Sequence, residues 1–349
     1  MERAVYRIID ANFNRAREAM RVIEEFCRFA VNSSSLTSRI KQLRHELCAA
    51  INDLDQGRLI AGRDTLQDVG VGKTVPNQLK RAGLYDCCTA ACKRLTEALR
   101  ALAETTQTIN PDLACKIEKI RYSTYTLEKD IVIFASAAEK YKPVRLYVVI
   151  TSDLPAEVLS LTHKCAAGGA DCIQLRAKSI PDDTLFALAR EFVVICKDAG
   201  VLSIINDRID IAVAAGADGV HLGQNDLPIE QVRKLQSYPL IIGKSTHSAE
   251  QLKAACLENP TYVGLGPIFA TPTKPTAQAV TLDYIKQAGE ILADTGIGHA
   301  AIGGINLDNV KKVLKAGAKT IAVCRAVTQA NDPAAACRAL KQKITGFSD

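Results

Sequence analysis

The sequence contains no tryptophan, few aromatic residues (5%) and no long apolar run. A membrane-spanning helix needs roughly 18 or more consecutive apolar residues, so none is predicted. Scarce aromatic rings and the lack of a Lys/Arg run also disfavour nucleic-acid binding, which relies on base stacking and on neutralising phosphates. The net charge of +6 is modest for a chain of 349 residues. We therefore expect small anionic ligands as partners, with no nucleic acid and no membrane, and the sequence leaves a homo-oligomer open.

The N-terminus lacks the apolar segment of a secretory signal and carries acidic residues early. The twelve cysteines are numerous, but most stand singly within expected helices and strands. Because disulfides are rare in reducing compartments, we predict reduced, largely buried cysteines in a cytoplasmic protein. Cys87, Cys88 and Cys92 form the one cluster. It has neither a second ligand pair nor a nearby histidine, which disfavours a metal site.

The chain is longer than most single domains, so two domains are expected. The sequence pattern changes between residues 135 and 143. Before that point apolar residues recur at helical spacing, which predicts a separate all-α domain over residues 1–138. Its helices are expected at 12–30, from the Ser33–Ser35 break to about 54, at 84–107 and at 112–134, with a loop at 57–78.

A motif of Arg and Glu recurs in this domain. Arg15, Glu18, Arg21 and Glu25 are repeated 79 residues later, at 94, 97, 100 and 104. Each copy precedes a second helix, which indicates two similar helical hairpins in one bundle. The alternative is that these are ordinary ion pairs, three and four residues apart, on exposed helix faces. The pattern alone leaves both interpretations open.

After Pro143 short β-rich runs alternate with helices. Eight such units in roughly 205 residues predict an α/β fold, a (β/α)8 TIM barrel over residues 144–349, with an open doubly wound sheet as the alternative. Gly169, Gly216 and Gly317 stand where a helix turns back to the next strand, as a left-handed C-cap requires. The strands are expected at 146–151, 171–175, 202–206, 219–222, 240–243, 262–264, 299–302 and 320–323.

Functional side chains of such a barrel gather after the carboxyl ends of the strands. Unusual polar residues follow seven of the eight expected strands, which predicts one binding site at the barrel mouth. In strand order they are Gln174, Arg176 and Lys178; Asn206 and Asp207; His221 and Asp226; Ser245; Thr271, Thr273 and Lys274; Gly303 and Gly304; and Cys324 and Arg325.

Asp207 and Asp226 follow neighbouring strands and offer hard oxygen ligands. Such a pair suits Mg²⁺, which keeps waters and takes its other ligands from substrate phosphates. Arg176, Lys178 and Lys274 could neutralise a diphosphate, the arginine as a planar fork and the lysines as point charges. A metal-assisted diphosphate site is therefore expected on this side of the mouth.

A second binding region is expected where strands seven and eight end. Gly303-Gly304 and the turn after Val323 would present backbone N–H groups to a phosphate, as the same turns do in other barrels. Thr271 and Thr273 lie on a loop rich in Gly, Pro and Thr, with the composition of a ligand cover.

Four of these residues also have a purely structural interpretation. Asp207 and Asp226 could cap the helices that follow them, and Gln174 could be a satisfied polar residue in the barrel. His221 is expected to be a hydrogen-bonded barrel histidine rather than a catalytic base. Structural roles do not explain why so many polar residues gather at one face, so we favour a functional site.

The mouth residues fall in runs that resemble the motifs of the thiamine phosphate synthase family, in the same order over about 200 residues. The runs are Gln174-Leu175-Arg176-x-Lys178, Ile205-Asn206-Asp207, Gly219-Val220-His221-Leu222-Gly223-Gln224-x-Asp226, Gly243-x-Ser245, Gly264-x-Gly266-Pro267-Ile268-Phe269-x-Thr271-x-Thr273-Lys274 and Ala301-Ile302-Gly303-Gly304-Ile305.

The resemblance implies a role for each residue. Arg176, Ser245 and Lys274 would be catalytic, and Asp207 and Asp226 would carry Mg²⁺. The pyrimidine diphosphate would be held by Gln174, Arg176, Lys178, Asn206, Ser245 and Lys274, and the thiazole phosphate by Thr271, Thr273, Gly303, Gly304, Cys324 and Arg325. At the last two positions the family usually has a small Val-Ser pair, which leaves open whether Arg325 contacts the phosphate.

The implied reaction is a transferase reaction, a dissociative substitution. Diphosphate leaves 4-amino-5-hydroxymethyl-2-methylpyrimidine diphosphate, and the nitrogen of hydroxyethylthiazole phosphate attacks the resulting cation to give thiamine phosphate. Such a site needs no side-chain nucleophile, only charge stabilisation and alignment.

Three other barrel functions fit less well. A thiazole tautomerase of the same fold has no use for diphosphate-binding cations or an aspartate pair. A ligand-binding barrel without activity would be expected to lack one of those residues. An aldolase needs an isolated, desolvated lysine inside the barrel, whereas Lys178 and Lys274 lie on mouth loops.

The helical domain resembles an extension fused to some bacterial thiamine phosphate synthases, and a small family implicated as hydroxymethylpyrimidine phosphate kinases. The resemblance predicts that it makes the diphosphate that the barrel consumes, with a regulatory or oligomerisation role as the alternative. Gly70–Thr74 looks like a nucleotide loop, but Gln67 replaces its first glycine and no strand precedes it. The matching runs are Asp10-Ala11-Asn12-x-Asn14-Arg15-x-Arg17-Glu18-x-x-Arg21-x-x-Glu24 and Arg63-Asp64-Thr65-x-x-Asp68-Val69-Gly70.

Overall fold

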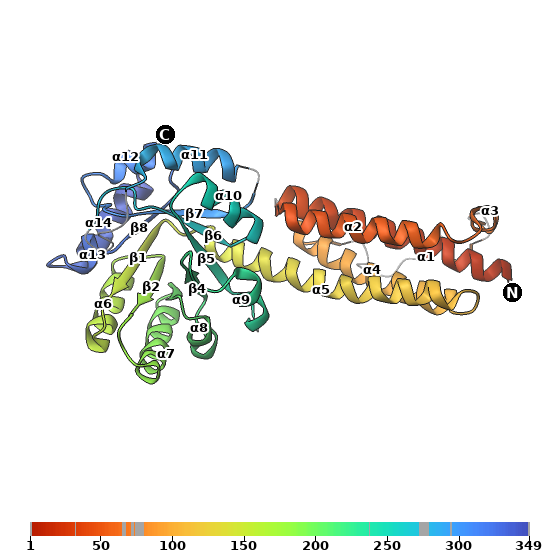
Figure 1. The fold of residues 1–349 in the computed structure, drawn as a ribbon, viewed down its shortest axis with the longest axis horizontal. Helices are drawn as coiled ribbons and strands as arrows, with labels where there is room; N and C mark the ends of the chain where they lie inside the picture. The colour runs from red at the N-terminus through yellow and green to blue at the C-terminus, as the bar shows by residue number, and fades with distance from the viewer. Residues whose placement is uncertain are drawn as a thin grey trace. The chain divides into compact units, whose positions relative to one another are not determined.

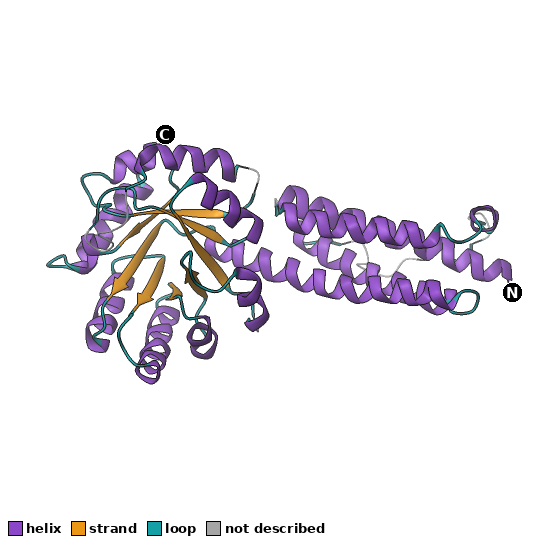
Figure 2. Ribbon diagram, in the orientation of Figure 1, coloured by secondary structure: helices purple, strands orange, loops and turns teal. Residues whose placement is uncertain are grey.

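The computed structural model describes residues 2–31, 33–64, 68–70, 73, 80–236, 238–271, 279–293 and 295–347. It contains two compact units, Met1–Val132 and Ile133–Asp349. The first is helical (Figure 1), and the second contains all the strands of the described chain (Figure 2). The boundary falls inside helix α5 (Pro111–Tyr141), which continues past its expected end at residue 134. The reason is burial, because Ala137 and Tyr141 in its last turns belong to a hydrophobic cluster of the second unit.

The first unit is built from α1 (Glu2–Glu25), a π-helical turn (Phe26–Ala30), α2 (Ser34–Ile51), α3 (Gln56–Ala61), α4 (Leu84–Thr106) and the first part of α5. The long helices follow the expected pattern, although α1 begins ten residues earlier. The expected loop at 57–78 is wrong in part, because α3 occupies its start. There the Asp55 side chain accepts a hydrogen bond from the Arg58 N–H and so caps a short helix of loop-like composition.

The two copies of the Arg/Glu motif lie on α1 and α4, which pack against each other. Arg21 pairs with Glu25 at 3.1 Å, and the equivalent Arg100 pairs with Glu104 at 2.5 Å. Both pairs are exposed, so the charged part of the motif does form ordinary surface ion pairs. Between the helices the apolar face is buried, with Ile9, Ala16, Met20, Ile23, Cys27, Leu95, Leu99 and Leu102 at its centre.

The second unit is a closed barrel of eight parallel strands in sequence order, ringed by helices (Figure 2), which confirms the (β/α)8 prediction. The strands are β1 (Leu146–Thr151), β2 (Cys172–Arg176), β3 (Leu202–Asn206), β4 (Gly219–Leu222), β5 (Ile241–Thr246), β6 (Tyr262–Leu265), β7 (Gly298–Ile302) and β8 (Thr320–Val323). The helices are α6 (Pro155–Ala167), α7 (Asp182–Asp198), α8 (Ile209–Ala215), α9 (Ile229–Leu235), α10 (Ala249–Glu258), α11 (Thr281–Leu292), α12 (Val310–Lys315), α13 (Arg325–Thr328) and α14 (Pro333–Thr345).

Side chains alternate along each strand between the barrel interior and the surrounding helices. On β1, Val148 and Ile150 pack outward into the large core beneath the helices, whereas Tyr147 and Val149 point inward. The interior cluster fills the lower barrel with Tyr141, Val144, Tyr147, Val149, Cys172, Ile204, Ile241, Tyr262, Ala300 and Ala322. This packing closes one end of the barrel and leaves the other end open for a ligand.

Two Gly-Ala-Asp segments, at 169–171 and 216–218, have a structural role at the closed end. Gly216 has a φ of 73° and ends α8 in the left-handed conformation, as expected. The aspartate that ends each segment, Asp171 or Asp218, accepts hydrogen bonds from a neighbouring strand. Asp171 accepts from the backbone N–H groups of Arg145 (2.8 Å) and Leu146 (2.9 Å). These contacts hold adjacent strands in register.

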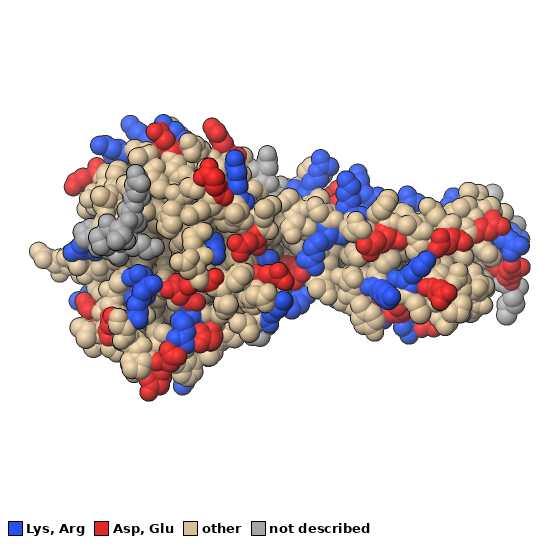
Figure 3. All heavy atoms as spheres, viewed as in Figure 1, with Lys and Arg blue, Asp and Glu red and all other residues tan. Residues whose placement is uncertain are grey.

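No helix in the described part of the chain has the length and apolar character to cross a bilayer. On the face drawn in Figure 3, Lys/Arg and Asp/Glu side chains are interspersed. All twelve cysteines are free thiols. Burial raises the pKa of Cys27 to about 12, so this thiol packs as a neutral, apolar side chain.

Candidate active site

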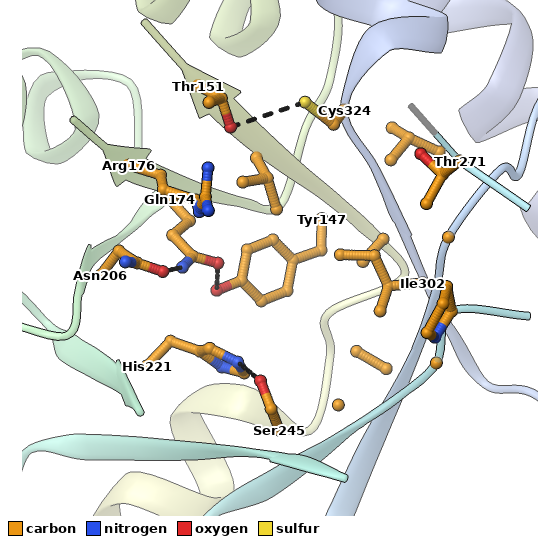
Figure 4. A pocket seen from close by; sticks show the side chains of 18 of the residues that line it. Tyr147, Thr151, Gln174, Arg176, Asn206, His221, Ser245, Thr271, Ile302 and Cys324 are labelled. Carbon is orange, nitrogen blue, oxygen red and sulfur yellow. Dashed lines mark hydrogen bonds between the residues drawn. The ribbon is translucent and has the colours of Figure 1, made fainter. Parts of the chain in front are cut away.

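A cavity of about 560 Å³ opens at the carboxyl ends of the strands (Figure 4). Gln174, His221 and Ser245 lie within β2, β4 and β5, and the other described members of the predicted set come from a strand end or the loop after it. All of them line this one cavity: Gln174, Arg176, Lys178, Asn206, Asp207, His221, Asp226, Ser245, Thr271, Gly303, Gly304, Cys324 and Arg325. Thr273 and Lys274, also predicted, lie outside the described residues.

Asp207 is held in an unusual backbone conformation. Its φ of 62° lies in the left-handed region, which costs a non-glycine residue of order 1 kcal/mol or more. The conformation is fixed by hydrogen bonds from the Asp207 N–H to the His221 carbonyl (2.8 Å) and from the Arg208 N–H to the Asn206 carbonyl (2.7 Å). Helix α8 has no side-chain cap, so the capping interpretation of Asp207 is wrong. Strain of this kind is characteristic of functional positions.

Asp207 and Asp226 lie next to each other at the mouth, after the neighbouring strands β3 and β4. The Lys178 ammonium lies 3.2 Å from Asp207 Oδ2, and the Gly223 N–H donates to Asp226 Oδ2 at 2.5 Å. Helix α9 also lacks a side-chain cap, so Asp226 does not cap it. Partial burial raises the pKa of Asp226, and the neighbouring Asp207 carboxylate adds to the rise.

This donor set fits a hard divalent cation. Two carboxylates that repel each other would be stabilised by positive charge between them. No group of three or more His, Cys, Asp or Glu side chains placed to hold a metal occurs among the described residues. A cation here would need waters and ligand oxygens to complete its coordination, as Mg²⁺ prefers.

A chain of hydrogen bonds crosses the bottom of the cavity, and Figure 4 shows its bonds between Ser245 and His221, between Tyr147 and Gln174, and between Gln174 and Asn206. It joins Ser245 to His221 (2.9 Å), His221 to Tyr262 (2.9 Å), Tyr262 to Tyr147 (2.8 Å), Tyr147 to Gln174 (3.0 Å), and Gln174 to Asn206 (2.7 Å). Both imidazole nitrogens of His221 are engaged, as expected for a hydrogen-bonded barrel histidine. Burial keeps the pKa of Tyr147 and of Tyr262 well above the ordinary value, so both phenols stay protonated.

The opposite side of the cavity is a glycine turn after β7. Gly303 (φ 106°) and Gly304 (φ 65°) adopt conformations that other residues rarely take. The loop after β6 packs against them, with the Phe269 N–H donating to the Gly303 carbonyl at 3.0 Å. A Cβ on Gly303 would lie 2.4 Å from Pro267 Cα. Only glycine therefore lets this loop, which carries Thr271, approach the turn.

Cys324 and Arg325 follow β8 on the same side. The Arg325 Nε–H donates to Gln329 Oε1 at 2.7 Å, so one face of the guanidinium is held along α13. The Cys324 thiol lies 3.8 Å from Thr151 Oγ1 across the β1–β8 seam. Arg325 thus lines the cavity with a tethered side chain.

Sequence reasoning missed Tyr147 and Tyr262, because buried aromatics on strands look like ordinary core residues. One signal was available. Tyr262 pairs in register with Gly243 and Gly298 on its two neighbouring strands. A Cβ on Gly243 would lie 2.3 Å from Tyr262 Cζ, so this glycine makes room for the ring.

In the helical unit the two predicted motif segments meet. The Arg63 guanidinium donates two hydrogen bonds to the buried Asp10 carboxylate, at 2.7 and 2.8 Å. Asn14 also donates to Asp10, and Arg7 donates to the Asp64 carbonyl. Of the segment that looks like a nucleotide loop, only Gly70 and Lys73 are described.

A closed barrel with a charged, glycine-lined mouth defines a (β/α)8-barrel enzyme. The family model "Thiamine monophosphate synthase" matches residues 146–327, and the model "ThiD2 family" matches residues 7–130. The thiamine-phosphate synthase of Thermosynechococcus vestitus is 38% identical over 97% of this chain and 95% of its own length. That of Rhodopirellula baltica is 40% identical over 93% of this chain and 88% of its own.

Among solved structures, the thiamine phosphate pyrophosphorylase of Pyrococcus furiosus is 33% identical, with a TM-score of 0.53 over 58% of this chain and 96% of its own. The chain therefore belongs to the thiamine-phosphate synthase family and is a transferase.

Proposed function

We propose that the mouth cavity joins 4-amino-5-hydroxymethyl-2-methylpyrimidine diphosphate to hydroxyethylthiazole phosphate, giving thiamine phosphate and diphosphate. One observation carries the proposal. Asp207, Asp226, Arg176 and Lys178 line one side of the cavity whose other side is the Gly303-Gly304 turn. A diphosphate and a second phosphate can thus bind in the same 560 Å³ space. Two substrates held this close would react in an effectively unimolecular step, which lowers the entropic part of the barrier.

In the reaction, the bond between the pyrimidine methylene carbon and the diphosphate oxygen breaks, and its electron pair leaves with the diphosphate. Arg176 and Lys178 offset the charge that develops on the leaving group. The thiazole nitrogen then donates its lone pair to the methylene cation and forms the new C–N bond. No side-chain nucleophile takes part in these two steps.

Asp207 and Asp226 would hold Mg²⁺. When bound, the ion supplies positive charge next to the leaving diphosphate. The two carboxylates fit it because they are hard oxygen donors brought together against their own repulsion. Lys178, paired with Asp207 at 3.2 Å, would turn toward the diphosphate once a cation neutralises the pair.

The remaining roles divide between the substrates. Gln174, Asn206 and Ser245 would hold the pyrimidine side, and Thr271, Gly303, Gly304, Cys324 and Arg325 the thiazole phosphate. Thr273 and Lys274 are assigned to the thiazole phosphate and the diphosphate by family resemblance alone.

The test is the formation of thiamine phosphate from the two phosphorylated precursors, with and without Mg²⁺. Asp226→Asn should lower kcat/KM by about 100-fold or more, since it removes a ligand of the charge-stabilising ion. Asp283→Asn is the matched control, because Asp283 lies exposed on α11 and forms a surface ion pair with Lys286. Equal activity of both variants, or full activity without any divalent cation, would contradict the assignment.

We further propose that the helical unit phosphorylates hydroxymethylpyrimidine phosphate with ATP and so supplies the barrel's substrate. The observation in favour is the Asp10–Arg63 contact, which joins the two motif segments through a carboxylate only 7% exposed. Burying a carboxylate is costly, and Arg63, whose side chain is 52% exposed, offsets that cost at the surface of the unit, where a substrate could reach the pair.

This activity can be tested in the full chain with the barrel disabled by Asp226→Asn. When the protein is given ATP and hydroxymethylpyrimidine phosphate, ADP and the pyrimidine diphosphate should then accumulate. Adding Arg63→Gln should abolish that product. The control is Arg58→Gln, since Arg58 forms exposed ion pairs with Glu2 and Asp55. If no diphosphate forms, an oligomerisation or regulatory role becomes the better account.

A further inference from the structure

The hydrogen-bond chain at the bottom of the cavity has a direction that can be worked out from its donors. The Tyr147 hydroxyl donates to Gln174 Oε1 at 3.0 Å. A phenol has a single hydrogen, so in the 2.8 Å contact between the two tyrosines Tyr262 must be the donor. Tyr262 has then used its hydrogen, and its oxygen can only accept.

The next two bonds follow from the same count. The 2.9 Å contact between His221 Nδ1 and the Tyr262 oxygen requires a proton on Nδ1. In the neutral ring the other nitrogen is then an acceptor. Ser245, 2.9 Å from Nε2, must therefore donate its hydroxyl hydrogen to the histidine. Every donor in the chain points the same way, from β5 toward β3.

The packing around Tyr262 keeps this chain in place. The Tyr141 ring, from the last turn of α5, stacks on the Tyr262 ring with centroids 4.3 Å apart and planes at 7°. Gly243 provides the space between Tyr262 and His221, because a Cβ there would lie 2.5 Å from His221 Nδ1. Tyr262 and Tyr147 are almost fully buried, so neither hydroxyl can turn to solvent for another partner.

We infer that this one-way chain determines the substrate's orientation and selects an aminopyrimidine. Ser245, whose hydrogen is committed to His221, can offer a ligand only oxygen lone pairs. Asn206, whose Oδ1 accepts from Gln174, still has both Nδ2 hydrogens to donate to a ligand. The 4-amino group of the pyrimidine would thus face Ser245, and the diphosphate would face Asn206 beside Asp207. The inference rests on the proposed function of the cavity, and it makes His221, Tyr262 and Tyr147 positioning residues.

If the donors of the chain pointed from β3 toward β5 instead, the cavity would bind this substrate poorly. It would place the Asn206 carbonyl oxygen next to an anionic diphosphate, and a Ser245 hydrogen against the donor hydrogens of the amino group. Two mismatched polar contacts in a partly desolvated cavity would weaken binding of this substrate.

The first test reads the histidine directly. The full-length protein is labelled with ¹⁵N-histidine, and the His221 signals are identified as those lost in His221→Gln, out of five histidines. At pH 8.5, above the usual titration range of histidine, Nδ1 should carry the proton and Nε2 should not. A proton on Nε2 in the unsubstituted protein would overturn the inference, whatever the enzymatic activity.

The second test measures specificity. We expect the protein to prefer the 4-amino substrate over its 4-oxo analogue by about 100-fold or more in kcat/KM. Tyr262→Phe removes the acceptor of Nδ1–H, so the His221 proton should move to Nε2 and free the Ser245 hydrogen. The preference should then fall by about 10-fold, together with the change in the ¹⁵N spectrum.

Tyr284→Phe is the matched control. Tyr284 is a buried tyrosine of α11 whose hydroxyl bonds to Thr246 and to the Ser248 carbonyl, outside the lining of the cavity. It should leave both the spectrum of His221 and the amino/oxo preference unchanged. An unaltered preference in Tyr262→Phe, or an equal loss in Tyr284→Phe, would contradict the inference. If no variant or unsubstituted protein makes thiamine phosphate, the proposed function itself fails, whereas the histidine measurement still decides the direction of the chain.

Discussion

The two ends of the barrel use the same residue types in opposite ways. At the closed end, Asp218 accepts from the Ser203 N–H (3.1 Å) and the Ser203 hydroxyl (3.0 Å), with Lys140 at 3.6 Å. Asp171 has two backbone donors and Lys341. At the open end, Asp207 and Asp226 face each other, one of them in a left-handed conformation. Carboxylates that have several hydrogen-bond donors stabilise the fold, whereas two carboxylates that repel each other are placed to bind a cation.

The largest expected effect is at Asp207. Asp207→Gly should lower kcat/KM for thiamine phosphate formation by about 100-fold or more, because a metal ligand is lost. The same substitution should raise the stability of the metal-free protein by about 1 kcal/mol, since glycine adopts a φ of 62° without strain. Steady-state kinetics and thermal unfolding measure the two changes. A variant that is both less active and less stable would place Asp207 with the structural aspartates.

At the closed end the effects should be reversed. Asp218→Ala leaves the buried Ser203 N–H and hydroxyl without their acceptor, which should cost about 1–3 kcal/mol of unfolding free energy. The kcat of the folded variant should stay within about twofold of the unsubstituted value, because Asp218 lies at the other end of the strands. Urea unfolding and activity at low temperature test this. If Asp218→Ala lost kcat while keeping its stability, the two ends of the barrel would not differ in the way described.

Much of this architecture was predictable from the sequence. The eight strands, the glycine C-caps and the polar residues after strands come from local patterns, and the structure confirms the barrel. The end of β5 was predicted three residues short because Lys244-Ser245-Thr246 is polar, although Lys244 is only 5% exposed. The α5 helix was predicted too short, since nothing local shows that Tyr141 will stack on Tyr262.

The site was predictable in part for a related reason. Charged residues at strand ends stand out in a sequence, and all those described line one cavity. The tyrosines do not stand out, because their role depends on partners 27 and 115 residues away. Strain is also a property of the folded chain, so the φ of Asp207 could not be inferred from the adjacent Asn206 and Arg208.

Two glycines allow a similar comparison between a position beneath the open end of the barrel and a position on the surface of a helix. Gly243→Ala would place a methyl group 2.3 Å from Tyr262 Cζ, which should cost about 1–3 kcal/mol and lower kcat/KM by displacing the ring. Gly289→Ala, on the exposed face of α11 with no heavy atom within 4 Å, should instead stabilise by about 0.5–1 kcal/mol. Thermal unfolding and kinetics of both variants check this. If both substitutions changed stability and kcat/KM equally, Gly243 would not be needed to make room for the Tyr262 ring.

The smallest effect is a pH dependence of stability at the mouth. The pKa of Asp226 is raised in the folded protein, so the folded state takes up this proton at a higher pH than the unfolded state. The carboxylate therefore destabilises the metal-free fold above its raised pKa, and the penalty is relieved as pH falls through that value. Asp226→Asn should remove this dependence and raise Tm at neutral pH by about 2 °C. An unchanged pH profile in the variant would contradict the like-charge contact.

The central claim is that the open end of the barrel binds diphosphate through a cation held by Asp207 and Asp226. Isothermal titration of inorganic diphosphate into the full-length protein, with and without Mg²⁺, tests it most directly. The account predicts binding that requires Mg²⁺ in the unsubstituted protein and in Asp218→Asn, and that is lost in Asp226→Asn. Diphosphate binding of equal affinity without Mg²⁺, or unaffected by Asp226→Asn, would contradict it.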